Sequence, residues 1–594
     1  MGIGTLLLIL QTWSPTPISP DSAEALRDLA HRAEWSYEYL LRSLAPIRRG
    51  YYPSSQRCDE IVGRFCLTFS SGSTRPRPDT TEASKVISAR QQAVEMLRRA
   101  FSALPNDLVT VGPLLRYLIE DGRAEEAVAA ARTFAWASSD SAWSELLLGY
   151  ALHAAEDDSL AEVHFLRGLE RLPEAERREI ESVAYLLEPR ERSLYNRMSA
   201  EERAAYEEAL WRLANPLYLT PGNERYAEHL ARHVWSRLLS VAPKVRRMHR
   251  WGKDLEQLTV RYGVPTSRER LLADHLLINT EETMVEYFDP NQLAYLPETL
   301  YYEGIPPTPP PGSAWVLEKE KARSGYHPLT IRKLYPLEHQ VSRFQVGADI
   351  LLRIDASLAL DSTAIGAAEA ESGLFILDRK YRLVGEERGA IEIGDDTARF
   401  HYETLHPPGD YVYSIELFEP ETRLAGRARY SIELPVPWVG QLALSDPLIT
   451  EPLKGGPEPE DRGSSRLKPR PSLILSNEDT IGIYLEAYHL DQGADGSSRY
   501  QVELTIGRAE EPSLIARAFG WLGRKIGLSR PAETPRLAWE GVSTGSGPAI
   551  LAVDLPLDDL EPGLYLIEIE VQDLISDGEM TATSSRLIRI GDDG

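Results

Sequence analysis

Small residues recur at a fixed interval in the first third of the chain. Ala93, Ala127 and Ala161 stand 34 residues apart. The same interval separates three loop positions, Pro105, Ser139 and Pro173. Between them, apolar residues recur three and four positions apart, which is the spacing of an amphipathic helix. Such a pattern predicts helical hairpins, each one repeat long, that stack where the small side chains allow close approach.

An interval of 34 residues is that of the tetratricopeptide repeat, which this segment resembles. The best copy runs over residues 142–173. In it, Gly149, Ala161 and Gly168 stand where the consensus has small residues, and Phe165 stands where it has a large one. The preceding copy is weaker, so we predict about two and a half repeats in an N-terminal α-helical solenoid.

The composition changes abruptly at residues 303–313, Glu-Gly-Ile-Pro-Pro-Thr-Pro-Pro-Pro-Gly-Ser. Neither a helix nor a strand interior tolerates so many prolines, so we predict an extended linker there. Helix-type spacing dominates from residue 21 to residue 285, and strand-type alternation dominates after the linker. Because 594 residues exceed what one hydrophobic core supports, the chain should contain several domains.

We therefore predict a multidomain α + β protein, with a helical solenoid, a small α/β segment and two C-terminal β-sandwiches. In chain order the predicted segments are a signal-like segment (1–20), N-terminal helices with a cysteine pair (21–84), helical repeats (85–200), the α/β region (201–302), the proline-rich linker (303–313), the first sandwich (314–454), a second linker (455–471) and the second sandwich (472–594). Crowded proline, glycine and charged residues indicate the second linker.

The C-terminal half contains an internal duplication. Residues 411–417 and 565–571 alternate apolar and polar side chains, as half-buried strands do. Both strands are entered through Pro-Gly-x-Tyr, at residues 408–411 and 562–565. Such an entry is common in immunoglobulin-like sandwiches, where the tyrosine covers one end of the core. We therefore predict that both sandwiches are immunoglobulin-like.

A motif in the α/β region carries a second resemblance. The sequence reads Arg250-Trp251-Gly252-Lys253-Asp254 and then Leu258-Thr-Val-Arg-Tyr262-Gly263-Val-Pro265. It resembles the GWxTD domain family, which is named for Gly-Trp-x-Thr-Asp and has a following strand that ends in Tyr-Gly-x-Pro. The matching residues are Trp251, Asp254, Tyr262, Gly263 and Pro265. The sequence departs from the family pattern at Arg250 and Lys253, where the family has Gly and Thr.

The resemblance implies an exported bacterial protein, and it supplies no catalytic activity to carry over, because none is established for the family. Trp251 is expected to pack against the helix that contains residues 223–239, and Asp254 to accept hydrogen bonds from an arginine or a backbone amide. Gly263 fits a turn at the end of the strand. A ligand or partner site at the motif is the alternative to this packing role.

Two cysteines and an apolar N-terminal run bear on the location of the chain. The spacing of Cys58 and Cys66 fits neither a zinc knuckle nor haem attachment, so a disulfide and two buried thiols are the alternatives. Residues 3–10 resemble the apolar core of a secretory signal but lack the leading basic residues. We expect a periplasmic or extracellular protein without a membrane span in the mature chain, and a cytoplasmic location is the alternative.

Three strings match catalytic or metal-binding motifs in part. Gly541-Val-Ser543-Thr-Gly545 matches a nucleophile elbow, but a strand rather than a helix is predicted after it, so we assign a hairpin loop. His229 and His233 have the spacing of two zinc ligands, but they lack the zincin glutamate and a third ligand. Asp491 to Gly496 lacks two ligands of a calcium loop and is predicted to be a hairpin turn. We therefore predict no catalytic, cofactor or metal site.

The formal charge of −25 makes broad binding to nucleic acid or anionic lipid unfavourable. A local basic cluster, assigned to a solvated helix face, contains Lys244, Arg246, Arg247, Arg250 and Lys253. Our leading hypothesis is a non-catalytic extracytoplasmic interaction or scaffold protein with a protein partner, in which the array presents a groove. The alternatives are a structural envelope component and a hydrolase or carbohydrate-processing enzyme whose carboxylates are too scattered to recognise. Paired acids such as Glu281-Glu282 and Asp395-Asp396 are commoner in solvated turns.

Overall fold

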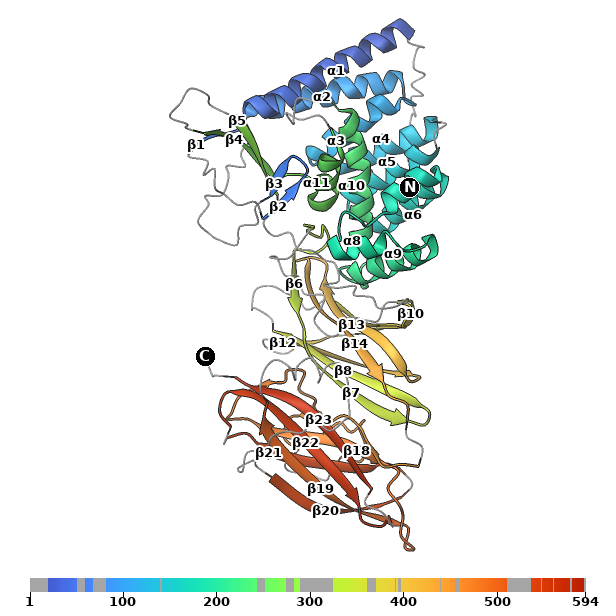
Figure 1. Cartoon of the computed structure of the whole chain (residues 1–594), viewed down its shortest axis with the longest axis vertical. Helices are drawn as coiled ribbons and strands as arrows, with labels where there is room; N and C mark the ends of the chain where they lie inside the picture. The colour runs from blue at the N-terminus through green and yellow to red at the C-terminus, as the bar shows by residue number, and fades with distance from the viewer. Residues whose placement is uncertain are drawn as a thin grey trace, which may run out of the picture. The chain divides into compact units, whose positions relative to one another are not determined.

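In the computed structural model the chain divides into two compact units. The helical unit contains Met1–Asn196, Pro221–Ala294 and Leu317–His327, and the sandwich unit contains Arg197–Thr220, Tyr295–Val316 and Pro328–Gly594. The structure describes residues 20–50, 59–67, 82–138, 141–187, 189–242, 251–273, 282–288, 324–359, 370–389, 391–393, 397–437, 440–453, 459–509, 536–545, 547–558, 560–576 and 580–591. Helices and several separate sheets are present, so the chain is a multidomain α + β protein (Figure 1).

Successive helices stack in the first part of the helical unit. They are α1 (Pro20–Ser43), α2 (Ser84–Ala103), α3 (Leu108–Glu120), α4 (Ala124–Ala137), α5 (Ser141–Ala154) and α6 (Asp158–Arg171), and each packs against the next. Ala93, Ala127 and Ala161 are fully buried. A Cβ atom on Gly149 would lie 2.8 Å from the ring of Phe165. The small residues of the 34-residue pattern therefore stand where neighbouring helices approach closely.

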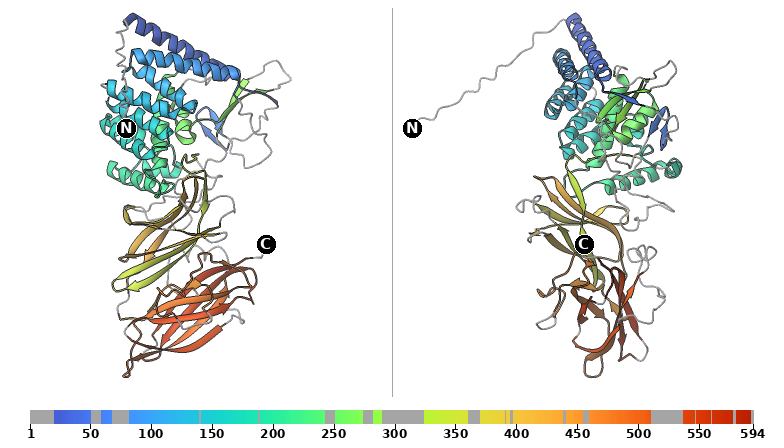
Figure 2. Two further views of the ribbon diagram at one scale, coloured as in Figure 1. Left: turned by 180° about the vertical axis from the view of Figure 1, so that it is seen from behind. Right: turned by 90° about the vertical axis from the view of Figure 1, so that its left-hand side faces the viewer.

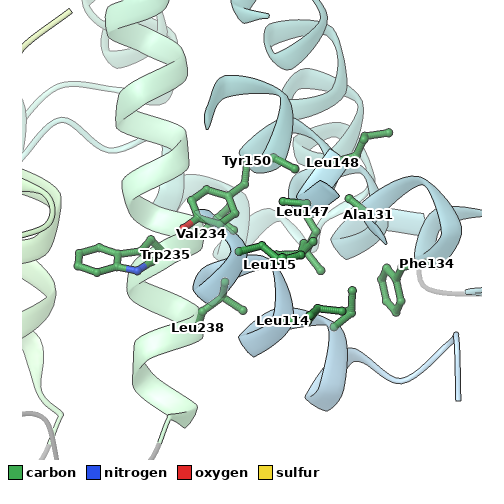
Figure 3. Packing of buried hydrophobic residues seen from close by; sticks show 14 of the residues in the cluster. Leu114, Leu115, Ala131, Phe134, Leu147, Leu148, Tyr150, Val234, Trp235 and Leu238 are labelled. Carbon is green, nitrogen blue, oxygen red and sulfur yellow. The ribbon is translucent and has the colours of Figure 1, made fainter. Parts of the chain in front are cut away.

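Helix α10 (Glu224–Val241) covers one face of this stack. It packs against α3, α5, α6 and α7 (Glu174–Glu181), and its apolar side chains belong to the same buried cluster as those of the stack. Figure 3 shows Val234 and Leu238 of α10 beside Leu115 of α3. A Cβ atom on Gly112 would lie 2.6 Å from Leu238 Cδ2, so α3 approaches α10 closely at this glycine. The chain thus fills this face of its own helical array.

The remaining elements of the helical unit are short. They are α8 (Pro189–Tyr195), α11 (Lys253–Tyr262), the hairpin of β2 (Glu60–Val62) and β3 (Phe65–Leu67), and a sheet of β1 (Ile47–Gly50), β4 (Ser267–Ala273) and β5 (Glu282–Tyr287) in the order β1-β4-β5. The predicted strand at residues 258–265 is wrong, because α11 is a helix. Its buried side chains include Leu255, Leu258 and Tyr262, and this helical spacing outweighs the strand preference of Thr259 and Val260.

Two facing sheets form the first sandwich of the sandwich unit (Figure 2). Its strands are β6 (Lys333–Pro336), β7 (Glu338–Val346), β8 (Asp349–Ala359), β9 (Glu371–Leu377), β10 (Leu383–Gly389), β11 (Glu392–Ile393), β12 (Thr397–His406), β13 (Gly409–Glu419) and β14 (Leu424–Leu434). The sheet orders are β10-β9-β13-β14-β6 and β11-β12-β8-β7. Alternate residues of both sheets, such as Ile354 and Ile415, share one core.

The second sandwich repeats this topology. Its strands are β15 (Ala443–Leu444), β16 (Leu448–Thr450), β17 (Ile474–Leu475), β18 (Thr480–Tyr488), β19 (Ser497–Arg508), β20 (Arg536–Thr544), β21 (Ala549–Pro556), β22 (Gly563–Asp573) and β23 (Thr581–Ile590). The order β17-β23-β22-β19-β20 matches β6-β14-β13-β9-β10, including the parallel pair at one edge. The opposite sheets match through β16-β18-β21 and β7-β8-β12, although β16 precedes β17 whereas β7 follows β6.

Both Pro-Gly-x-Tyr entries have the same local structure. β13 begins at Gly409 and β22 begins at Gly563. The hydroxyl of Tyr411 donates to the carbonyl oxygen of Pro407 at 3.0 Å, and that of Tyr565 donates to the carbonyl oxygen of Glu561 at 2.9 Å. In each sandwich the tyrosine therefore fastens the strand entry to the backbone four residues upstream.

The two sandwiches join through a partly polar contact. Phe344, Leu448, Leu467 and Tyr484 form a buried apolar cluster there. The side-chain amide of Gln340 donates to the carbonyl oxygens of Ile449 and Arg470 at 2.7 Å each. Part of the predicted second linker thus packs into this joint, and the second sandwich starts at β15, ahead of the predicted boundary at residue 472.

Candidate functional site

The residues that match the GWxTD motif gather around α11. Asp254 lies in its first turn and accepts hydrogen bonds from Arg64 Nε at 2.6 Å and Arg64 Nη2 at 2.7 Å. The hydrogen bond from Arg64 lowers the pKa of Asp254 to about 2. Gly63 has a φ of +54°, and a Cβ atom there would lie 2.6 Å from Asp254 Cβ. The left-handed turn of the β2–β3 hairpin therefore lets α11 approach it closely.

A second bidentate pair fixes the same hairpin. Arg261 near the end of α11 donates from Nη1 and Nη2 to Glu60 at 2.9 and 2.6 Å, and Nη2 also donates to the hydroxyl of Tyr262 at 2.7 Å. Val62 of the hairpin packs with Leu258 and Tyr262. Cys66 of β3 is disulfide-bonded, while Cys58 lies outside the described residues, so their pairing stays a prediction.

Trp251 immediately precedes α11 and is half-buried rather than part of a buried cluster. The expected burial of this indole against the helix containing residues 223–239 is therefore incomplete. Pro265 follows Gly263 and is buried. Asp254 and Tyr262 thus connect α11 to the β2–β3 hairpin. Trp251 retains exposed surface that another molecule could contact.

Next to α11 lies a group that we call the imidazole cluster: the buried side chains His153, Asp158 and Arg232, and the partly buried Glu228. His153 bonds through Nδ1 to Asp158 and through Nε2 to Glu228 at 2.8 Å. Arg232 pairs with Glu228 and donates from Nη1 to the carbonyl oxygen of Arg261 at 2.8 Å. This carbonyl group belongs to the last turn of α11, where no following helical N–H group is left to donate to it. The cluster therefore connects α5, α6, α10 and α11.

The charges in the imidazole cluster stabilise one another. Burial alone would lower the pKa of His153, but the hydrogen bonds to Asp158 and Glu228 outweigh burial and raise the pKa to about 10. Burial would raise the pKa of Glu228, whereas Arg232 and His153 lower it to about 2. His153 is thus a stable imidazolium at neutral pH. It holds its proton too tightly to act as a general acid or base near pH 7.

His229 and His233 lie on α10 with their ring centroids 4.7 Å apart. His229 donates from Nε2 to the carbonyl oxygen of Ile180 at 3.0 Å. Burial lowers the pKa of His229 well below its usual value and that of His233 to about 4. Both rings are therefore neutral core side chains at pH 7. Within the described ranges, no group of three or more His, Cys, Asp or Glu side chains is arranged to hold a metal ion.

The sandwich unit contains a second buried charged group, the guanidinium cluster, at the contact of β13 and β14 with the chain after α9 (Ala200–Ala214). Arg429 and Glu416 pair at 2.8 Å with both side chains fully buried. Arg429 Nη1 also donates to the carbonyl oxygens of Leu213 and Asn215, both at 2.8 Å. Glu416 accepts from the backbone N–H of Tyr218 at 2.6 Å. This cluster fastens α9 and its following loop to the first sandwich.

The remaining motif strings lie in the second sandwich. Ser543 is in β20, and β21 follows; the two strands belong to different sheets, so the predicted hairpin loop is a connection between sheets. Asp491 to Gly496 likewise connects β18 and β19 of different sheets instead of forming a hairpin. There the Asp495 carboxylate accepts from the backbone N–H and the hydroxyl of Ser497.

Several predictions fall outside the described residues. They concern residues 3–10, the linker at 303–313, Cys58, Lys244, Arg246, Arg247, Arg250, Glu281 and the pair Asp395-Asp396. Lys253 is described and exposed, at the start of α11. Among the helices that the structure describes, none combines the length and apolar character needed to cross a bilayer.

The sequence predicted that Asp254 accepts hydrogen bonds from an arginine, but it did not identify Arg64 as the donor or the charged partners His153 and Glu228. His153 and Glu228 are separated by 75 residues, and Arg64 and Asp254 by 190. No local pattern marks such pairs, because each is created by the packing of distant elements. The nearest signal was the acidic first turn of α6, where Asp157 caps the helix and Asp158 follows.

Comparison with known proteins adds no identification. No family model matches the sequence, and no curated protein matches it. Trypsin-activated alpha-2-macroglobulin from Escherichia coli has 12% identity and a TM-score of 0.16, with 44% of this chain and 15% of that chain covered. A fragment of the native Escherichia coli protein has 16% identity and a TM-score of 0.13, with 45% and 74% covered. A Salmonella alpha-2-macroglobulin variant has 13% identity and a TM-score of 0.15, with 55% and 19% covered. At these TM-scores the similarities support no conclusion about this chain.

Proposed function

We propose that this chain is a non-catalytic extracytoplasmic interaction or scaffold protein. The observation that carries the proposal is how the polar groups around α11 are used. Asp254 and Arg261 bind the β2–β3 hairpin, and Arg232 binds the end of α11. Side chains committed to such internal bonds stabilise a surface rather than bind and transform a substrate.

A tetratricopeptide-like array and two immunoglobulin-like sandwiches are the modules of this proposal. The close packing at Ala93, Ala127 and Ala161 supports the array, and the repeated topology with Tyr411 and Tyr565 supports the sandwiches. Because α10 covers the face of α3 and α5, we place the partner site elsewhere than in a groove there. The joined sandwiches would act as a spacer of limited flexibility.

The half-exposed Trp251 is the proposed contact with a partner, at a segment that resembles GWxTD domains. An indole ring offers a large apolar surface with a polar N–H group, a combination enriched at binding hot spots. The disulfide at Cys66 in the neighbouring hairpin fits an oxidising compartment outside the cytoplasm. Location and partner contact are therefore consistent with one exported interaction protein.

Site-specific photo-crosslinking in the native envelope tests the proposal. A crosslinking residue at position 251 should give a discrete adduct, whereas one at Trp136, an 89% exposed tryptophan on α4, should not. Trp251→Ala should leave the melting temperature unchanged and abolish an adduct made from neighbouring Lys253. A lowered melting temperature with the adduct retained would assign Trp251 to packing. Turnover of a hydrolase substrate by the purified chain would overturn the non-catalytic proposal.

A further inference from the structure

Helix α1 exposes aromatic side chains on the face that does not pack against α2. Trp35 is 53% exposed and Tyr39 is 48% exposed, and their rings stack at 5.4 Å with an interplanar angle of 10°. The opposite face is buried, where Tyr117 donates to Glu38 at 3.0 Å. Figure 1 shows α1 at one end of the helical stack, with α2 on one side. Among the described residues, the aromatic pair thus lies on a side of α1 that α2 does not cover.

The surrounding residues form a stripe along this face. Asp28 and Arg32 are exposed on one side of Trp35, and Arg42 is half-exposed beyond Tyr39. Positions 28, 32, 35, 39 and 42 alternate spacings of four and three, which is the periodicity of a seam between two packed helices. Because any face of an α-helix has this spacing, the feature that distinguishes this one is the stacked aromatic pair at its centre, which a solvated face does not favour.

We propose that this face binds the same face of a second copy of the chain, with the two α1 helices antiparallel. Asp28 and Arg42 each lie seven residues from Trp35, so a two-fold axis at Trp35 brings Asp28 of one copy beside Arg42 of the other. The same axis brings Arg32 close to Tyr39 of the other copy, where a guanidinium can stack on the ring. Every contact away from the axis occurs twice.

The charges on this face of α1 indicate that a second copy of the chain, rather than another protein, binds there. An isologous interface requires that the stripe be complementary to itself under a two-fold rotation. Opposite charges placed symmetrically about the aromatic centre meet this requirement, whereas a stripe for a basic or acidic partner would carry one sign of charge. This inference is independent of the proposed function, since it uses no residue around α11.

Sedimentation equilibrium of the full chain over a wide concentration range tests the proposal. The chain should pass from one to two copies, and Trp35→Glu should weaken self-association at least about tenfold. Trp136→Glu, at a tryptophan of α4 that is more exposed than Trp35, should leave self-association unchanged. Because these side chains are exposed, the variants should fold, and Tyr39→Glu replaces Trp35→Glu if that variant does not.

A charge swap tests the antiparallel register. Asp28→Arg alone and Arg42→Asp alone should each weaken self-association by roughly three- to tenfold, because like charges then face each other. The double variant should return to near the wild-type association constant, since both pairs are restored with reversed sign. A monomer at every concentration, equal dimerisation of the Trp35→Glu and Trp136→Glu variants, or a double variant no stronger than the single variants would overturn the proposal.

Discussion

The helical unit and the sandwich unit each contain a charged cluster that joins distant segments, but only the cluster of the helical unit includes an imidazolium beside its guanidinium. In the imidazole cluster, His153 is charged because two carboxylates accept its two ring N–H groups. In the guanidinium cluster, Arg429 binds one carboxylate and two backbone carbonyls. A guanidinium stays protonated at any pH that proteins withstand, whereas an imidazole does not.

Because of this difference, the connection in the sandwich unit should be independent of pH, whereas the connection in the helical unit should depend on pH. The planar fork of Arg429 fixes α9 on the first sandwich through geometry that pH leaves unchanged. The connection between α5 and α10 depends on a proton, which the neighbouring carboxylates retain. The sandwich unit should therefore keep its local structure over a pH range in which the helical unit loses stability.

The largest effect should follow from breaking the guanidinium cluster. Arg429→Met leaves the buried Glu416 without its counter-charge, which costs about 3–5 kcal/mol of unfolding free energy. Calorimetry of the full chain should show a lower melting temperature for the transition of the sandwich unit. Arg388→Met is the matched control, because Arg388 is exposed and pairs with Glu386; it should cost less than about 1 kcal/mol. Equal losses in the two variants would contradict the role of burial.

Alkaline pH should destabilise the imidazole cluster selectively. His153 has a pKa of about 10 in the folded chain and an ordinary value of 6.5, so folding favours its charged form. The resulting stabilisation is complete below pH 6.5 and is lost as the pH rises through 10, by on the order of 2–4 kcal/mol. As the pH rises between these values, calorimetry should show a larger fall in the melting temperature of the helical unit than in that of the sandwich unit, whose transition Arg429→Met identifies.

The variant His153→Gln provides the control for that titration. Glutamine can still bond to one carboxylate but carries no titrating charge, so the helical unit should be less stable at pH 6.5 and nearly independent of pH up to 10. An unchanged pH dependence in this variant would assign the alkaline loss to other groups. A parallel loss in both units would contradict the contrast between the two clusters.

Sequence periodicity predicted those features of the fold that recur at regular intervals along the chain. The 34-residue interval marked Ala93, Ala127 and Ala161, which are fully buried in the helical stack, and the repeated Pro-Gly-x-Tyr entries marked Tyr411 and Tyr565 at equivalent strand starts. Because both signals are local or periodic, they can be recognised in a single sequence. The division into helical and strand-rich halves follows from the same kind of signal.

Non-local packing was beyond such reasoning. Nothing adjacent to residues 224–241 indicates that α10 covers the helical stack, because its apolar stripe would suit any apolar partner. The resemblance to GWxTD domains implied a strand at residues 258–265, yet the packing of Leu258 and Tyr262 against the β2–β3 hairpin stabilises a helix there. The two charged clusters combine residues from elements far apart, and their partners could be known only from the fold.

Gly263 gives the smallest and most specific test of the imidazole cluster. Its φ is +71°, and a Cβ atom there would lie 3.1 Å from Arg232 Nε. Gly347, on the β7–β8 turn, has a φ of +63° and no heavy atom within 4 Å of such a Cβ. Gly347→Ala should thus cost about 1 kcal/mol from backbone strain alone. Gly263→Ala should cost about 2 kcal/mol or more, because its ψ of −142° adds backbone strain and because Arg232 must also move away from the end of α11.

Chemical denaturation of both variants measures the difference in their unfolding free energies. The pH dependence of the stability of the Gly263→Ala variant provides a second test. If Arg232 holds Glu228 in place for His153, its displacement should also reduce the alkaline stability loss, since the pKa of His153 depends on Glu228. Equal costs for the two alanine variants would mean that Arg232 adapts freely. The connection between α11 and the imidazole cluster would then be looser than the hydrogen bonds indicate.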